Sequence, residues 1–181
     1  MRLVNADYKI SKNYVPDNLQ EPNIKMNHTQ MVRGELVQPL EDMFVAARKE
    51  NIYLKLVSGY RSYREQVSLW YTYVNRYGIS YASRMDDHPG ASEHQLGLAV
   101  DLGNENGACE LEDCFRQYSS SKWLVENAWK YGFIQRYPEE KEDVTGIMYS
   151  PWHYRYVGKE EADKIHNSEL TMEEYCQQLG Q

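Results

Sequence analysis

The sequence predicts an α+β domain in which a small antiparallel sheet is flanked by helices. Short strand-like segments are mixed with amphipathic helical segments, and they lack the regular strand–helix–strand alternation of a parallel sheet. A length of 181 residues suits one domain with one core. The hydrophobic content of 41% and the charged content of 26% are ordinary for such a domain. We therefore expect residues 1–181 to form a single domain.

The N-terminal part of the chain is expected to contain an irregular arm, a helix and a strand. Residues 1–34 have little periodicity and contain two prolines, which favours an arm that wraps around the domain. Residues 35–50 have the apolar spacing of an amphipathic helix. Residues 53–58 alternate as a strand, which Gly59 ends.

A second helix is predicted after a capping box formed by Ser62 and Glu65. It should end at Gly78, because glycine is the usual residue just past a helix. Residues 80–93 are expected to form a loop. The predicted core-facing residues of the helix are Val67, Trp70, Tyr71, Val74 and Tyr77.

The C-terminal half should alternate between strands and helices. Its predicted segments are a buried strand at 98–102, a helix at 121–131, a strand at 133–137, a charged loop at 138–145 and a strand at 152–157. Thr171 and Glu174 form a second capping box, which predicts a last helix.

The charge balance excludes some classes of partner. A formal net charge of −7 argues against a nucleic-acid partner and against simple adsorption to an anionic membrane. No apolar run approaches the length of a membrane span, and no signal peptide is visible at the N-terminus. We expect a soluble monomer, either a cytoplasmic protein or an exported domain without its anchor.

Cys109 and Cys114 lie five residues apart in an apparent loop. A disulfide between them would suit an exported protein, whereas two free thiols would suit the cytosol. Cys176 lies in a helical pattern and is expected to be packed in the interior.

Three residues have the chemistry of a zinc site: His94, Asp101 and His153. His94 and Asp101 are seven residues apart, a span of about 23 Å in an extended chain, so the chain must fold back between them. Gly97 is the residue able to make that bend. Three protein ligands leave a fourth position open, which is typical of a catalytic zinc. We expect the zinc to lie in a cleft on the sheet.

The joint pattern resembles the zinc D-alanyl-D-alanine carboxypeptidases of the vancomycin-resistance type, with their dipeptidase and L,D-carboxypeptidase relatives. The resemblance covers roughly residues 54–158. It is carried by Ser92-x-His94-x-x-Gly97-x-Ala99-x-Asp101, Pro151-Trp152-His153, Ser58-Gly59-Tyr60-Arg61-Ser62, Gln135-Arg136-Tyr137 and Tyr154-Arg155-Tyr156-Val157-Gly158.

The resemblance assigns roles to individual positions. It makes His94, Asp101 and His153 the zinc ligands, and it makes Arg61 the residue that steadies the scissile carbonyl. The implied substrate contacts are Gln66, Ser92 and Trp152.

The implied function is removal of the terminal D-Ala from peptidoglycan stem peptides or their precursors, in the cell envelope. The alternatives are an L,D-carboxypeptidase or a D,D-dipeptidase that uses the same site. An alternative of another class is a zinc-bound module that recognises peptidoglycan without catalysis. A cytoplasmic location also stays open.

Position 150 departs from the family pattern. The family has a glutamate three residues before the last histidine, which carries the proton during hydrolysis, and this chain has Ser150. A serine is a poor proton acceptor, and general acid–base help is worth about 10²–10⁴-fold in rate. The sequence therefore predicts an impaired or inactivated variant, unless Glu139, Glu140 or Asp143 from the charged loop replaces the missing carboxylate.

Overall fold

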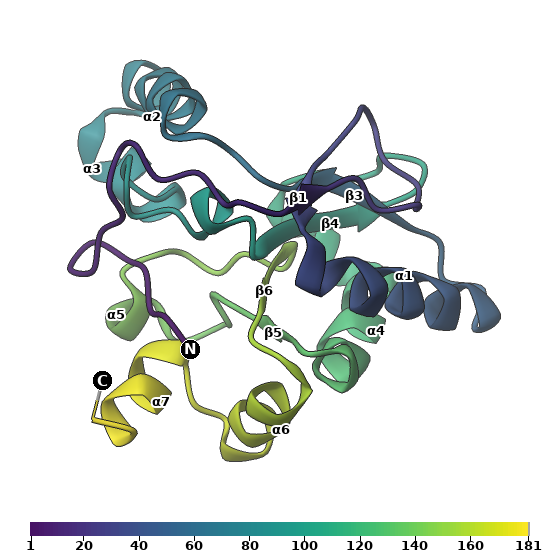
Figure 1. Cartoon of the computed structure of the whole chain (residues 1–181). Coiled ribbons are helices and arrows are strands. Elements are labelled where there is room, and N and C mark those ends of the chain that lie inside the picture. Colours follow the sequence, from purple (N-terminus) through teal and green to yellow (C-terminus); the bar gives the residue numbers. More distant parts are fainter. Residues whose placement is uncertain (181) are drawn as a thin grey trace.

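The computed structural model describes residues 1–180, and its centre is a four-stranded antiparallel sheet (Figure 1). The strand order is β3-β4-β6-β5. The strands are β3 (Leu54–Ser58), β4 (Ala99–Asn104), β6 (His153–Tyr156) and β5 (Phe133–Gln135). All six residues of β4 are buried, as expected of an inner strand that is covered on both faces.

Helices cover the sheet, which confirms the predicted α+β class. In Figure 1, α1 and α4 lie together on one side of the sheet, and α2 and α3 pack on each other at the opposite side of the molecule. The α-helices are α1 (Gly34–Lys49), α2 (Tyr63–Tyr77), α3 (Ile79–Met85), α4 (Ser119–Asn127), α5 (Glu142–Thr145), α6 (Lys159–Ser168) and α7 (Met172–Gln178). Three short 3₁₀ helices are η1 (Glu93–Leu96), η2 (Asp113–Gln117) and η3 (Ala128–Tyr131).

The main core lies between the sheet, α1 and α4. Leu36, Leu40 and Met43 of α1 are fully buried against Leu56 and Leu102 of the sheet. A second, smaller apolar cluster joins Ile134 of β5 to α6 and α7. Burial of this apolar surface is the main favourable contribution to folding, at roughly 25 cal/mol per Å².

The N-terminal arm wraps around the domain and contains a two-stranded antiparallel sheet of β1 (Leu19–Gln20) and β2 (Val32–Arg33). The backbone of the arm forms hydrogen bonds with two turns that also hold candidate site residues. The Arg33 N–H donates to the carbonyl of Gly97, which lies in the turn after His94, at 2.9 Å. The Tyr60 N–H likewise donates to the carbonyl of Met31 in the arm at 2.6 Å. The arm therefore supports the segments from which the site is built.

Several elements differ from the sequence-based expectation. A loop was expected over residues 80–93, but Ile79–Met85 forms helix α3, and α6 was not predicted at all. The charged loop contains the short helix α5. The predicted inner stripe of α2 was wrong for Tyr71 and Tyr77, whose side chains are 61% and 40% exposed. These tyrosines face outward because only a short part of α2, around Gln66 and Trp70, contacts the body of the domain.

No helix in residues 1–180 combines the length and the apolar character that a bilayer span requires.

Candidate metal centre and active-site cleft

His94, Asp101 and His153 come together from three different elements. His94 lies in η1, Asp101 is in β4, and His153 begins β6 directly opposite Asp101 in the antiparallel register. Their possible ligand atoms all lie within 4.8 Å of one another, and all three residues are buried. Gly97 ends η1 with a φ of 68°, in the left-handed region, and so turns the chain back as predicted.

A hydrogen bond sets the orientation of the His94 imidazole, and Asp101 lies close to both imidazoles. The Nδ1 atom of His94 lies 2.6 Å from the Gly59 carbonyl, which makes Nδ1 the donor and leaves the Nε2 lone pair directed at Asp101. His94 Nε2 lies 3.2 Å from Asp101 Oδ2, and His153 Nδ1 lies 2.9 Å from Asp101 Oδ1. His94 Nε2, His153 Nδ1 and the Asp101 carboxylate therefore lie close enough together to bind one metal ion.

The protonation states suit a metal cation. Burial lowers the pKa of His94 and so favours its neutral form. Burial by itself would raise the pKa of Asp101, but His94 and His153 outweigh it and hold this pKa well below the usual range. Neutral imidazoles and an ionised carboxylate are the forms that bind zinc. The donor set therefore fits a zinc ion.

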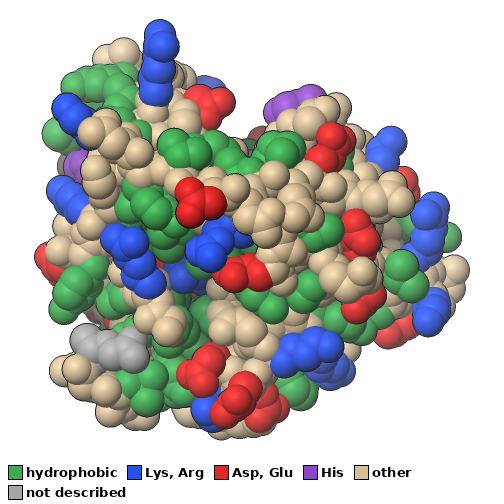
Figure 2. Space-filling view, viewed as in Figure 1, with side chains coloured by type: hydrophobic (Ala, Val, Ile, Leu, Met, Phe, Trp, Pro, Cys, Tyr) green, Lys and Arg blue, Asp and Glu red, His purple; other side chains and the backbone are tan. Residues whose placement is uncertain are grey.

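The three residues line a cavity of about 670 Å³ that opens to solvent. Figure 2 shows the surface hollowed at its upper edge, beside helix α2. Residues of α2, of the arm segment 27–31 and of the turn before β6 also line this cavity. A cavity of this volume can hold several residues of a peptide.

Arg61 also lines the cavity and is held in a fixed position. Its guanidinium donates to Gln66 Oε1 at 2.7 Å and to Ser58 Oγ at 3.1 Å. It also lies 3.7 Å from Asp101 Oδ2 and 3.9 Å from Asp86 Oδ1. A cation fixed beside the possible metal ligands can stabilise negative charge that develops on a substrate carbonyl.

The predicted substrate contacts have different surroundings. Trp152 is half-buried and lines the cavity. Gln66 is buried outside the cavity lining, and its amide donates to Asp86 Oδ2 at 2.9 Å and to the Asp87 carbonyl at 2.7 Å. Ser92 is also buried, and its Oγ has no hydrogen-bond partner among residues 1–180. Gln66 therefore holds Arg61 and the loop at 86–87, whereas Ser92 keeps a free hydroxyl.

Ser150 lines the cavity, but its hydroxyl is bonded to the backbone of Met148. The Oγ atom donates to the Met148 carbonyl at 3.0 Å, and the Ser150 carbonyl accepts from the His153 N–H at 3.1 Å. The charged-loop carboxylates Glu139, Glu140 and Asp143 are not among the residues that line the cavity. The loop that sequence analysis considered as a substitute is thus directed elsewhere.

Two carboxylates in this cavity, Asp86 and Asp87, were not predicted as part of the site. They precede Pro89 and Gly90 in the segment that leads to η1, and both line the cavity. Asp87 accepts from the hydroxyl of Tyr137 at 3.0 and 3.2 Å, and the Tyr137 ring stacks on His153. The available signal was an acidic pair shortly before the first motif.

The other histidines lie outside the metal-binding group. The ring of His88 packs against Trp70 in a tilted arrangement, with centroids 3.9 Å apart, and His166 stacks on Trp129. His28 lines the cavity, which sequence analysis did not anticipate.

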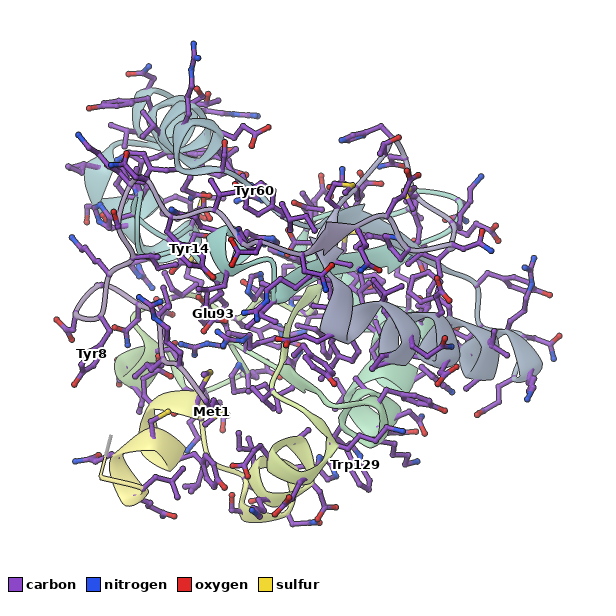
Figure 3. The ribbon with its side chains drawn as sticks, viewed as in Figure 1. Met1, Tyr8, Tyr14, Tyr60, Glu93 and Trp129 are labelled. Atoms are coloured by element: carbon purple, nitrogen blue, oxygen red, sulfur yellow. A yellow bond between two sulfur atoms is a disulfide. The ribbon has the colours of Figure 1, made fainter. Side chains whose placement is uncertain are left out.

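A buried ion network lies behind the metal-binding group. Glu93, the neighbour of His94, lies near the middle of the molecule in Figure 3. Its carboxylate is 3.0 Å from Arg136 Nε and 2.8 Å from an Arg155 nitrogen. Burial raises the pKa of Glu93, but the two arginines outweigh burial and lower it below the usual range. The network links η1 to β5 and β6, and Glu173 of α7 extends it through Arg136.

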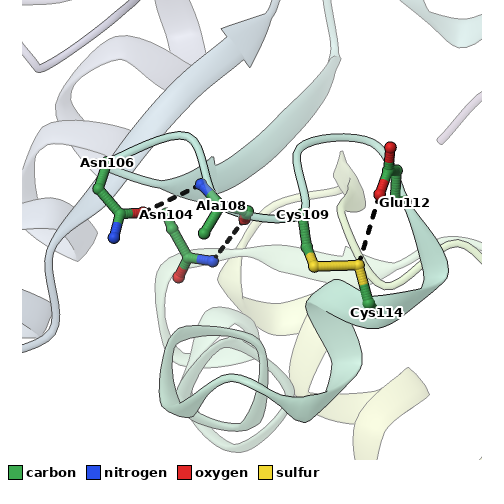
Figure 4. Close-up of a disulfide and its surroundings, with 6 residues drawn as sticks. All are labelled: Asn104, Asn106, Ala108, Cys109, Glu112 and Cys114. Atoms are coloured by element: carbon green, nitrogen blue, oxygen red, sulfur yellow. Dashed lines mark hydrogen bonds between the residues drawn. A yellow bond between two sulfur atoms is a disulfide. The ribbon is translucent and has the colours of Figure 1, made fainter.

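A disulfide joins Cys109 and Cys114 at the edge of the cleft (Figure 4). The bridged loop contributes Glu110 and Leu111 to the cavity lining. Glu110 forms an ion pair with the buried Lys55 of β3, which fixes the loop to the sheet.

Comparison with known proteins agrees with this arrangement. The VanY family model, described as D-alanyl-D-alanine carboxypeptidase, matches residues 29–159. A curated relative, the putative carboxypeptidase YodJ of Bacillus subtilis strain 168, is 41% identical over 184 residues. That match covers 99% of this chain and 67% of YodJ.

Two solved structures share the fold. The structure of the LD-carboxypeptidase LdcB, described with its basis of peptidoglycan recognition, has a TM-score of 0.90 and 42% identity. That match covers 97% of this chain and 84% of the LdcB chain. A VanY D,D-pentapeptidase from a VanB-type resistance cassette, a glutamate-to-alanine variant in complex with Zn(II), has a TM-score of 0.83 and 34% identity. The alignment covers 97% of both chains.

Proposed function

Because this chain belongs to the VanY family of D-alanyl-D-alanine carboxypeptidases, we propose that it removes the terminal D-Ala from peptidoglycan stem peptides or their precursors. The observation that carries the proposal is the convergence of His94, Asp101 and His153 in an open cavity, beside the fixed guanidinium of Arg61. The proposed cofactor is zinc, which the VanY structure also binds.

The donor set defines the proposed metal chemistry. His94 Nε2, an Asp101 oxygen and His153 Nδ1 would hold zinc and leave a position open toward the cavity. Bound zinc would lower the pKa of a coordinated water and polarise the scissile carbonyl.

The remaining roles follow from contacts in this chain. The Arg61 guanidinium is proposed to bind the carbonyl oxygen as it gains charge, while Gln66 keeps that guanidinium in place. Trp152 is proposed as a wall of the substrate cavity. Ser92 is proposed as a substrate contact, because its buried hydroxyl has no partner among residues 1–180 and lies two residues from His94.

An L,D-carboxypeptidase is the second candidate, and the likeness to LdcB favours it. The two activities use the same bond chemistry and differ in the residue before the terminal D-Ala. The open cavity of about 670 Å³ has room for a peptide longer than a dipeptide. We therefore propose pentapeptide stems that end in D-Ala-D-Ala as the preferred substrate.

The test is to offer the zinc-loaded protein a pentapeptide, a tetrapeptide and free D-Ala-D-Ala at equal concentrations and to follow D-Ala release. We expect the pentapeptide to react fastest. Faster release from the tetrapeptide would establish the L,D activity instead, and faster release from the dipeptide would make this a dipeptidase. Binding of all three without release would identify a recognition module.

The proposed location is the outer side of the cytoplasmic membrane. The Cys109–Cys114 disulfide supports it, because disulfides persist in oxidising compartments. Mass spectrometry of non-reduced peptides from the protein made in its own host tests this location, and two free thiols there would favour the cytoplasm.

A further inference from the structure

Hydrolysis of a peptide bond needs a group that takes a proton from water and returns one to the amine. The glutamate expected for this role is replaced by Ser150, whose hydroxyl already donates to the Met148 carbonyl. Full general acid–base help therefore requires a different side chain in the same cavity to carry the proton.

Five carboxylates line the cavity, and most of them have other functions. Asp101 belongs to the metal-binding group. Glu65 caps helix α2 through the Ser62 backbone and hydroxyl, and Glu110 is paired with Lys55. Asp86 faces Arg61 and accepts from the Gln66 amide. Asp87 is the remaining one, and no ion pair to it is present among residues 1–180.

Asp87 and Ser150 both line the cavity and both form hydrogen bonds with Tyr137. The Tyr137 hydroxyl donates to both of its carboxylate oxygens, at 3.0 and 3.2 Å. The Tyr137 ring stacks on His153, with centroids 5.0 Å apart, and the Tyr137 carbonyl accepts from the Ser150 N–H at 3.1 Å. One residue, Tyr137, therefore ties Asp87, Ser150 and His153 together.

We infer that Asp87 is the carboxylate that carries the proton in this chain. From the segment before η1, it takes the role that Ser150 cannot fulfil because serine has no carboxylate. The inference rests on the proposed function. As the water oxygen bonds to the carbonyl carbon, one water proton passes to an Asp87 oxygen. The carbon–nitrogen bond then breaks, and Asp87 returns that proton to the leaving nitrogen. The new carboxylic acid gives its remaining proton to the amine, so Asp87 ends ionised.

The surroundings of Asp87 allow its carboxyl group both to accept a proton and to donate one. The pKa of Asp87 is raised to about 7, chiefly by burial and then by the negative charges of Asp86 and Glu93. The positive charges of His153 and Arg136 partly oppose this rise. Tyr137 stays neutral, because burial raises its pKa well above the usual range. A carboxyl group with a pKa near the working pH can both accept and donate a proton.

Four zinc-loaded forms test the inference: the unmodified chain, Asp87→Asn, Ser150→Glu and the double variant. Asp163→Asn on the exposed face of α6 is the matched control. We expect Asp87→Asn to lower kcat/KM at least about 100-fold, following the usual contribution of a general base, with zinc content unchanged. Ser150→Glu should change the unmodified chain less than about 10-fold but restore most of the loss in the double variant. The control should stay within about 2-fold.

Carboxyl NMR of zinc-loaded protein labelled with ¹³C at the aspartate carboxylates gives a readout besides activity. We expect one resonance to titrate above the usual aspartate range and to disappear in Asp87→Asn. In the unmodified chain, kcat/KM should fall at low pH with the same midpoint as this carboxyl titration. This comparison needs no variant.

The possible results separate the inference from the proposed function. If Asp87→Asn keeps its activity within about 3-fold while Ser150→Glu alone gains about 100-fold, Asp87 carries no proton and the carboxypeptidase function stands. If no form releases D-Ala although each binds zinc, the proposed function fails and the inference fails with it.

Discussion

At the scale of single residues, the site depends on a few side chains whose positions are fixed by hydrogen bonds. His94 is oriented by the Gly59 carbonyl, and Arg61 by Gln66 and Ser58. Ser58 ends β3, Gly59 directly follows it, and Gln66 lies in the first part of α2. The end of β3 and the start of α2 therefore hold the proposed metal ligand His94 and the cation of Arg61 side by side.

Arg61→Ala should lower kcat about 10²–10³-fold, the usual loss when a donor to the developing oxyanion is removed. Zinc content should not change, because the guanidinium is 3.7 Å from Asp101 and is not a metal ligand. Steady-state kinetics and metal analysis measure both quantities. The matched control is Arg64→Ala on the exposed side of α2. Equal kinetic losses in the two variants would disprove a direct role of Arg61.

At the scale of elements, the turn between η1 and β4 decides whether His94 and Asp101 meet. A Cβ at Gly97 would lie 3.0 Å from Arg33 Cγ and 3.1 Å from Leu19 Cδ2, and the residue has a φ of 68°. At Gly146, φ is 76°, but nothing lies within 4 Å of a Cβ. The two glycines therefore share the backbone strain and differ in the contacts.

Gly97→Ala should weaken zinc binding, whereas Gly146→Ala should not. Both variants should lose about 1–2 kcal/mol in free energy of unfolding from the left-handed conformation. Only Gly97→Ala also pushes against the arm and displaces η1. Competition with a zinc chelator compares the affinities, and equal affinities in the two variants would show that the turn does not position His94.

The sequence predicted those elements that carry a strong local signal. The capping boxes at Ser62 and Thr171 are both present, because a cap is formed by residues three positions apart. Helices α3 and α6 escaped prediction, since each is short or polar and is stabilised by packing that the sequence does not display. The ends of helices and strands that precede a glycine were predicted well, whereas the polar helix α6 was not predicted.

The residues of the candidate site that belong to short sequence motifs could be predicted from the sequence. The metal-binding group was predicted from spacing and residue type. Asp87 was not, because its relevant neighbour Tyr137 lies 50 positions away and only the folded chain brings the two together. Gln66 was predicted as a substrate contact, and this stays a prediction; in the folded chain its side chain also bonds to Arg61 and to Asp86.

At the scale of the whole molecule, the buried Asp87 couples stability to pH. Its pKa is raised from 3.8 to about 7, mainly by burial. A raised carboxyl pKa means that the folded state holds its proton more tightly than the unfolded state. The stabilisation is complete below pH 4 and is lost as the pH rises through 7. Three units of pKa correspond to about 4 kcal/mol.

Asp87→Asn should therefore gain stability relative to the unmodified chain as the pH rises. In metal-free protein the difference in free energy of unfolding should be smallest near pH 4 and approach about 4 kcal/mol at pH 8. Urea denaturation at several pH values measures it, with Asp163→Asn as the control that shows no such trend. A constant difference would mean that Asp87 is ionised throughout this range.

The central claim is that His94, Asp101 and His153 hold one catalytic zinc, and elemental analysis of the purified protein tests it most directly. The comparison is between the unmodified chain, His153→Ala and His166→Ala, since His166 stacks on Trp129 outside the metal-binding group. We expect about one zinc per chain in the unmodified protein and in His166→Ala, and a loss of zinc in His153→Ala. Full zinc occupancy in His153→Ala would contradict the site.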